Sequence, residues 1–91
     1  MMEPSIGRIV HYTLNAIDVA RINELRKQRE ILANTAETGQ VYPMLIVRTW
    51  GETPESAVNG QVFLDGDDVL WVTSRSVGEG PGHYAWPVVK R

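Results

Sequence analysis

The chain opens with a strand-like segment and then changes to a helical period. Residues 7–14 are mostly β-branched and aromatic, which predicts a strand. Asn15 is a favourable N-cap residue, and Asp18 three positions later completes a capping signal. Residues 16–36 contain no Gly or Pro, and Gly39 supplies a stop. Four apolar residues recur there at helical spacing: Ile22, Leu25, Leu32 and Ala36. The pattern predicts one amphipathic helix of roughly five turns.

The rest of the chain has the composition of strands separated by turn residues. Four segments are rich in β-branched and aromatic side chains: residues 41–50, 58–64, 69–75 and 83–89. The second and third flank Asp-Gly-Asp-Asp at 65–68, where Asp-Gly supplies the positive φ values of a tight hairpin turn. Residues 76–82 hold three glycines and predict a flexible connection. The order β-α-β-β-β-β predicts an α+β fold, a small antiparallel sheet or SH3-like barrel with the amphipathic helix packed on it.

Alternation along two of these strands places tryptophan and arginine on shared faces. Trp71 and Arg75 share one face of the strand at 69–75. Ile46, Arg48 and Trp50 line up on the strand at 41–50. Such a face suits a planar anion, which it would bind by stacking and by charge-assisted hydrogen bonds. The competing interpretation is core packing of each Trp beside the aliphatic stem of an Arg.

Composition limits the classes of protein. The 91 residues fit one domain, which we expect at residues 7–91 after a flexible start at 1–6. Without cysteine, the chain forms no disulfide and no Cys-based zinc site. Apolar runs stay well short of the roughly 20 residues of a membrane span, so we expect no membrane association. A formal net charge of −2 gives no bulk attraction to nucleic acid, and we expect no sequence-specific nucleic-acid partner.

The small net charge conceals a segregation of charges along the chain. Residues 21–29 carry four basic side chains and one acidic one, whereas residues 52–82 carry six acidic side chains and one basic one. One interpretation is a solvated helix face with pairs such as Arg26–Glu30. The other is a local anion site, at which Asn23 and Arg26 present an amide and a guanidinium from one helix face.

Motifs for catalysis or metal binding are missing from the sequence. The serines lack the Gly-x-Ser-x-Gly elbow, and the glycines at 78–82 do not precede a helix as a phosphate loop requires. His11, His83 and the aspartates at 65–68 lack the spacing of metal ligands. We therefore expect a protein that is not an enzyme and has no cofactor or metal.

A run of short motifs covers most of the chain. They are Gly-Arg-Ile-Val-His-Tyr at 7–12, Ile-Asn at 22–23, Val-Tyr-Pro at 41–43, Val-Arg-Thr-Trp-Gly at 47–51, Val-Asn-Gly-Gln-Val-Phe-Leu-Asp-Gly at 58–66, Leu-Trp-Val-Thr-Ser at 70–74, Gly-Pro-Gly at 80–82 and Trp-Pro at 86–87. In these motifs the chain resembles a group of small uncharacterised bacteriophage and prophage proteins. The resemblance implies a phage origin and a place in the cytoplasm of the infected bacterial host, or in the virion. It implies no particular activity.

Two functions fit a small phage protein without catalytic equipment. The first is counter-defence, in which a homo-oligomer sequesters a small, anionic, nucleotide-derived signalling molecule where its subunits meet. The candidate binding residues are Tyr12 and Trp71 for stacking, Arg26, Arg48 and Arg75 for phosphate, and Asn23 and Asn59 for polar recognition. The alternative is a protein–protein interaction module, either a virion component or an inhibitor of a host protein. Convergence of the arginines on Trp71 favours the first, and an exposed apolar patch favours the second.

Overall fold

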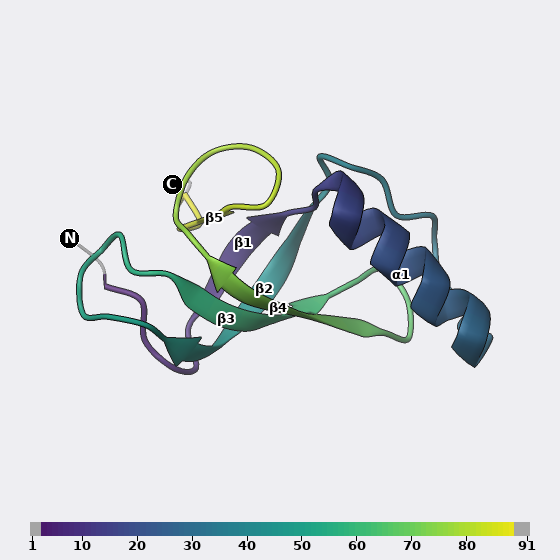
Figure 1. Cartoon of the computed structure of the whole chain (residues 1–91), viewed down its shortest axis with the longest axis horizontal. Helices are drawn as coiled ribbons and strands as arrows, with labels where there is room; N and C mark the ends of the chain where they lie inside the picture. Colours follow the sequence, from purple (N-terminus) through teal and green to yellow (C-terminus); the bar gives the residue numbers. More distant parts are fainter. Residues whose placement is uncertain (1–2, 89–91) are drawn as a thin grey trace.

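One helix and five strands form in the predicted order. The computed structural model describes residues 3–88, with β1 (Ile9–Thr13), α1 (Ala16–Arg29), β2 (Val41–Thr49), β3 (Val58–Phe63), β4 (Val69–Arg75) and β5 (Tyr84–Ala85). The strands make one sheet in the order β4-β3-β2-β1-β5, and each neighbouring pair is antiparallel (Figure 1). The α+β class and the antiparallel sheet are confirmed.

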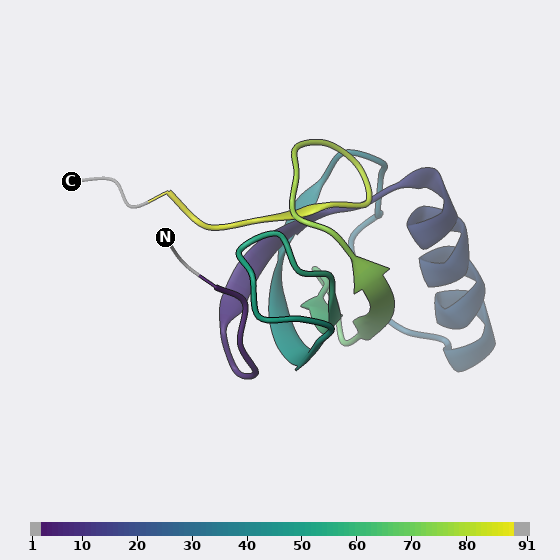
Figure 2. The same cartoon turned by 60° about the vertical axis from the view of Figure 1, so that its left-hand side comes forward.

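The sheet is open but strongly curled. Arg75 of β4 donates a hydrogen bond from Nε to the Tyr12 hydroxyl of β1 at 2.9 Å, although β2 and β3 lie between these strands. At about 4.8 Å per strand, a flat sheet would hold β1 and β4 roughly 14 Å apart. The two edges meet only past the end of β4, where Val77 forms a parallel bridge with Tyr84. The sheet therefore closes toward a barrel at one end, and α1 lies beside its open side (Figure 2).

The core fills the concave side of this sheet. Every strand contributes to it, and α1 adds Ile22: the buried apolar side chains are Val10, Tyr12, Leu14, Ile22, Ala36, Met44, Ile46, Val58, Val62, Leu64, Leu70, Val72 and Tyr84. Along β1 and β4, buried residues alternate with exposed ones, as in a sheet packed on one face only. The opposite, convex face is consequently left to solvent.

The helix begins as predicted and ends earlier. Asn15 accepts a hydrogen bond from the backbone of Asp18, and Asp18 accepts one from the backbone of Asn15, so the predicted capping signal is a complete capping box. The predicted end near residue 36 is wrong, because Glu30 adopts φ 52° and closes the helix at Arg29. Leu32, expected on the apolar stripe, is 84% exposed.

Pairing with a distant turn explains the early end. After the helix, Ala33 forms an antiparallel bridge with Gly66, and the Asn34 amide donates to the Asp65 carbonyl at 2.9 Å. The hairpin between β3 and β4 is confirmed, but none of residues 65–68 has the predicted positive φ. Gly66 is instead required by close approach, since a Cβ there would overlap the Ala33 methyl group.

Two irregularities flank Asn59 in the middle of the sheet. Ile46 pairs with Gly60 while Arg48 pairs with Asn59, so β2 carries one extra residue at this level. On the other side β4 also carries one extra residue, with Ser74 at φ 55°. Each bulge reverses the alternation beyond it, and two predicted faces are therefore wrong. Ile46 is buried whereas Arg48 and Trp50 are exposed, and Arg75 turns inward whereas Trp71 stays outside.

The ends of the described chain lie against the sheet. Pro4, within the segment expected to be flexible, is buried, and the Gly7 amide donates to the Ile46 carbonyl at 2.8 Å. Of the strand predicted at 83–89, only Tyr84–Ala85 forms, and residue 89 lies outside the described residues. Within residues 3–88, no helix is both long enough and apolar enough to cross a membrane.

Candidate functional site

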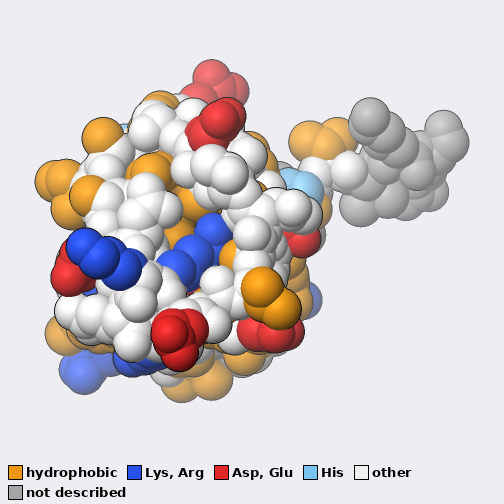
Figure 3. Space-filling model, turned by 90° about the vertical axis from the view of Figure 1, so that its right-hand side faces the viewer, with side chains coloured by type: hydrophobic (Ala, Val, Ile, Leu, Met, Phe, Trp, Pro, Cys, Tyr) orange, Lys and Arg blue, Asp and Glu red, His pale blue; other side chains and the backbone are white. Residues whose placement is uncertain are grey.

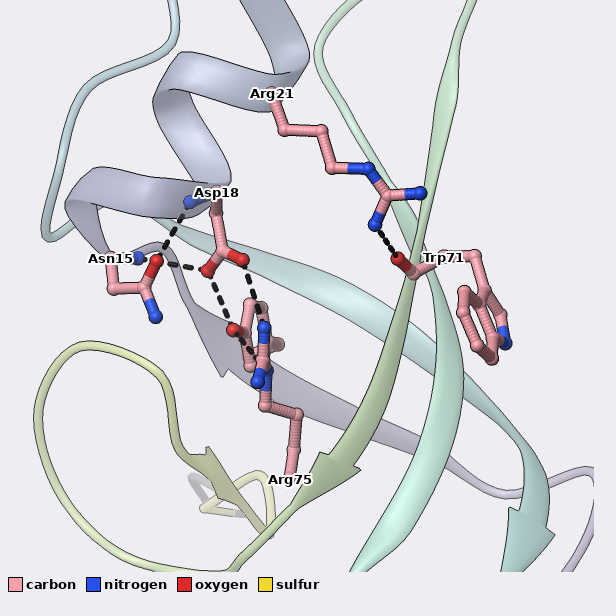
Figure 4. A network of polar contacts seen from close by, with 6 residues as sticks. Asn15, Asp18, Arg21, Trp71 and Arg75 are labelled. Atoms are coloured by element: carbon pink, nitrogen blue, oxygen red, sulfur yellow. Dashed lines mark hydrogen bonds and ion pairs between the residues drawn. The ribbon is translucent and has the colours of Figure 1, made fainter.

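Tyr12 and Arg75, two of the predicted binding residues, belong to a largely buried polar network at the start of α1, and Figure 4 shows its members Asn15, Asp18 and Arg75. Asp18 is only 3% exposed and accepts from the Tyr12 hydroxyl at 2.6 Å, from the Asn15 amide at 3.0 Å and from Arg75 Nη2 at 3.2 Å. Burial is the main cause that raises the pKa of Tyr12, and the hydrogen bond to Asp18 adds to it. The Tyr12 ring is fully buried, so it has no face on which a ligand could stack. The network holds the helix to β1 and β4.

Arg26 binds an aspartate of the same chain. Its Nε and Nη2 donate to the two carboxylate oxygens of Asp68 at 2.7 and 3.2 Å, and its Nη1 donates to the Asn34 carbonyl at 2.7 Å. Both side chains of the ion pair are about nine-tenths buried, at 11% and 9% exposed. Arg26 pairs with Asp68 in place of the expected Glu30, while Asn23 stays exposed on the helix.

This ion pair explains part of the charge segregation of the sequence. Arg26 of the basic helix contacts Asp68 of the acidic turn, and Asn34, in the segment after the helix, donates from Nδ2 to the Asp65 carboxylate at 2.9 Å. Figure 3 shows the side of the molecule beside α1, where basic and acidic side chains are interspersed rather than gathered into one basic patch. The ion pair Arg26–Asp68 thus joins the basic segment to the acidic one.

Arg48 and Asn59 lie together at a second place, around Trp50. The Asn59 carboxamide oxygen accepts three hydrogen bonds, from Trp50 Nε1 at 2.9 Å, from Thr73 Oγ1 at 2.8 Å and from the Ser74 amide at 2.8 Å. The Arg48 guanidinium stacks 3.9 Å from the centroid of the Trp50 ring. Arg48 and Trp50 are both exposed, whereas Asn59 is buried. The predicted set omits Trp50, which is the exposed aromatic ring beside one of its arginines.

The seven predicted residues thus lie in separate places. Trp71 is on the convex face and is 43% exposed, and its carbonyl accepts from Arg21 of α1 at 3.2 Å (Figure 4). The guanidinium groups of Arg26 and Arg75 are engaged by Asp68 and Asp18. Within one chain, Trp71 therefore does not meet these two arginines at a common anion pocket.

The convex side of the sheet carries a continuous uncharged surface, which we call the outer face. One cross-strand row follows the pairs Ile9–Leu45, Leu45–Gln61 and Gln61–Trp71. The neighbouring positions are Phe63 and Val69, which pair with each other, and His11, which pairs with Pro43 and Ala85. The outer face thus consists of Ile9, His11, Pro43, Leu45, Gln61, Phe63, Val69, Trp71 and Ala85, and no member carries a formal charge with His neutral.

Several members of the outer face are large apolar residues left open to solvent. Ile9, Phe63, Val69 and Trp71 are each between 41% and 48% exposed. The alternation along these strands is the signal by which the sequence could have revealed this surface, since each member lies next to a core residue. An exposed apolar surface with aromatic side chains favours an interaction module over a small-ligand site.

A groove of about 410 Å³ lies at the β5 end of the outer face. His11, Val41 and Trp86 form part of its lining, and Gly78 to Gly80 form its wall on the other side, with Glu79 between them. The wall is hydrogen-bonded in place, because the Gly78 amide donates to the Tyr84 carbonyl at 3.0 Å. The loop beyond it is held too, by a bond of 2.8 Å from the Gly82 amide to the Thr13 carbonyl. The connection expected to be flexible thus forms one side of a shaped cavity.

Residues 3–88 contain no group of three or more His, Cys, Asp or Glu side chains placed to hold a metal ion. Comparisons with protein-family models, with curated proteins and with solved structures found no match for this chain. What the protein does is therefore inferred from its own surfaces.

Proposed function

We propose that this protein is a non-enzymatic interaction module that binds another protein through the outer face of its sheet. The observation that supports the proposal is the combination of no formal charge with exposed Ile9, Phe63, Val69 and Trp71 on one contiguous surface. Centres of protein interfaces are depleted in charge and enriched in aromatic side chains, as this surface is.

The outer face has the size of the centre of an interface. Its members span three residues on each of β1 to β4 and one on β5, which at about 4.8 Å per strand and 3.3 Å per residue gives roughly 24 by 10 Å, or about 240 Å² in projection. A standard interface buries about 800 Å² per partner, so the partner would also contact the neighbouring surface. The groove beside β5 is continuous with the outer face through His11 and Ala85 and supplies part of that surface.

Other surfaces support this assignment less well. The concave face is filled by the core, and the exposed side of α1 carries the charges of Arg21, Lys27 and Arg29 but no aromatic side chain. We propose accordingly that the module, as a phage protein in the bacterial cytoplasm, covers a surface of a host protein. A role in the virion would use the same face.

Site-specific photo-crosslinking tests the proposal. The amino acid p-benzoylphenylalanine replaces Trp71 on the outer face in one variant and Lys27 on the exposed side of α1 in the control, and both are produced and irradiated in bacterial cells. We expect a discrete protein adduct from position 71 and none of that mass from position 27. Adducts of equal yield from both positions, or none from position 71, would refute the outer face as the binding surface.

A small anionic ligand is a second candidate function, favoured by the Arg48–Trp50 stack. Its exposed guanidinium and indole, 3.9 Å apart, offer charge and a flat surface to a nucleotide-like molecule, at one chain or between two. A panel of cyclic oligonucleotides and cyclic ADP-ribose isomers tests it by thermal melting. A ligand at 100 times its Kd would add about 2.7 kcal/mol, which raises the Tm by roughly 10 °C or more. Arg48→Gln should abolish that shift and Arg29→Gln should keep it. No shift with any member refutes this candidate.

A further inference from the structure

We infer that the groove beside β5 receives a Lys or Arg side chain of the partner protein. The inference rests on the proposed function and names the chemistry of one contact within it. It follows from three properties of the groove: its volume, its apolar lining and its single carboxylate.

The groove has the size and the preformed wall of a binding pocket. Its volume of about 410 Å³ falls in the range of roughly 300–1,000 Å³ in which ligand pockets are found. The hydrogen bonds of Gly78 and Gly82 hold the loop that walls it. A partner side chain would therefore enter without first ordering this loop, which lowers the entropic cost of binding.

The lining is apolar along most of its length. Val41, Ala85, Trp86 and Val88 supply aliphatic and indole surface. Lys and Arg side chains bury their methylene stems along such an apolar surface and keep the charged group in a polar environment. A short polar or acidic side chain would leave this lining uncovered.

Glu79 gives the groove a negative charge. Among residues 3–88, it is the one carboxylate that lines the groove, and no Lys or Arg of that range lines it. Trp86 adds a π face that attracts a cation, and Arg8 already lies 5.6 Å from the centroid of that ring. Arg8 is not part of the lining, so its guanidinium lies outside the groove.

Repulsion from Arg8 does not cancel this preference. Arg8 is exposed and does not line the groove, whereas Glu79 does, so the carboxylate is the charge nearer to a cation in the groove. Solvent and salt screen the more distant charge of Arg8 more strongly.

The experiment compares two peptides that differ in charge alone. Acetyl-Ala-Arg-Ala-amide and acetyl-Ala-citrulline-Ala-amide are titrated to 10 mM into the ¹⁵N-labelled full chain at pH 7.5, and amide and indole shifts are followed. We expect the arginine peptide to move the signals of Gly78, Gly80, Ala85 and the Trp86 indole, with a Kd at least fivefold below that of the citrulline peptide. Glu79→Gln should remove the difference between the peptides, whereas Glu52→Gln, which changes an exposed carboxylate outside the groove, should keep it.

Three outcomes would overturn the inference. They are no movement of these signals at 10 mM peptide, equal binding of the two peptides, and an unchanged preference in Glu79→Gln. Movement of the same signals with protein concentration alone would assign the groove to a second copy of the chain and would also overturn it. The crosslinking result at position 71 is independent of these outcomes, so failure of the groove and failure of the outer face are distinguishable.

Discussion

Replacing Asn59 by Ala tests whether one carboxamide holds the irregular centre of the sheet. The substitution removes the acceptor of three hydrogen bonds, from Trp50, Thr73 and Ser74. A hydrogen bond contributes about 1 kcal/mol net, and water can replace the acceptor for the exposed Trp50 and Thr73 side chains. The Ser74 amide also loses its acceptor, and its residue holds φ 55°, a left-handed conformation that costs about 1 kcal/mol without support. The expected loss in free energy of unfolding is therefore about 2–3 kcal/mol.

Urea denaturation measures this loss. A chain of this size has a total stability of about 5–14 kcal/mol, so the variant remains folded and its midpoint falls by about 2–3 M for an m-value near 1 kcal/mol per M. Asn59→Asp keeps an acceptor oxygen and should lose less than half as much at pH 7. Gln61→Ala, two residues along the same strand and on the outer face, is the matched control and should change stability by less than 0.5 kcal/mol. A loss below about 0.5 kcal/mol in Asn59→Ala would refute the role of Asn59 in holding the bulges.

Three further predictions concern contacts elsewhere in the fold. Because burial raises the pKa of Tyr12 above its ordinary value of 10, the folded chain keeps a proton that the unfolded chain releases. Stability should therefore be full below pH 10 and fall above it, and Tyr12→Phe should make that fall shallower in melts from pH 9 to 11.5. Gly66→Ala should cost about 1–3 kcal/mol in urea denaturation because the new methyl overlaps Ala33, and adding Ala33→Gly should recover part of it, since the Ala33 Cα still lies 2.9 Å from the new Cβ. A double-mutant cycle of Arg26→Met and Asp68→Asn should give a coupling of about 1–3 kcal/mol, since this bidentate pair is largely buried.

Each of these three predictions has an outcome that would contradict it. The pKa of Tyr84 is also raised, chiefly by burial, so Tyr12→Phe should leave a residual slope, and a wild-type stability that is flat to pH 11.5 would contradict the argument. Failure of the second substitution to rescue Gly66→Ala would place the strain elsewhere than at Ala33. A coupling below 0.5 kcal/mol would make the Arg26–Asp68 contact no stronger than an exposed ion pair.

Local signals in the sequence predicted the helix and the strands. The features that the sequence did not predict depend on long-range contacts. The start of α1 was predictable because Asn15 and Asp18 cap it within four residues. Its end was not, because the chain leaves the helix to pair Ala33 with Gly66, more than thirty positions away. Strand positions follow from composition, but neither bulge has a local signature, since both depend on what lies across the sheet from Asn59.

For the candidate site too, local features were predictable from the sequence and long-range contacts were not. The alternation rule that grouped Trp71 with Arg75 fails at Ser74, where one extra residue reverses the faces. The segregation of basic and acidic residues was visible in the sequence. The contact between the two segments was not, because Arg26 and Asp68 lie 42 positions apart. The outer face could have been found by asking which strand residues alternate with the core and carry no charge.

The network around Asp18 also bears on how the chain folds. Its contacts reach 57 and 63 positions along the chain, from Asp18 and Tyr12 to Arg75. The helix is 14 residues long, near the length at which isolated helices are marginally stable in water. It is therefore stable only once its contacts with β4 have formed. Helix and sheet should consequently appear and disappear in one cooperative transition, with slow folding dominated by the search for these distant contacts.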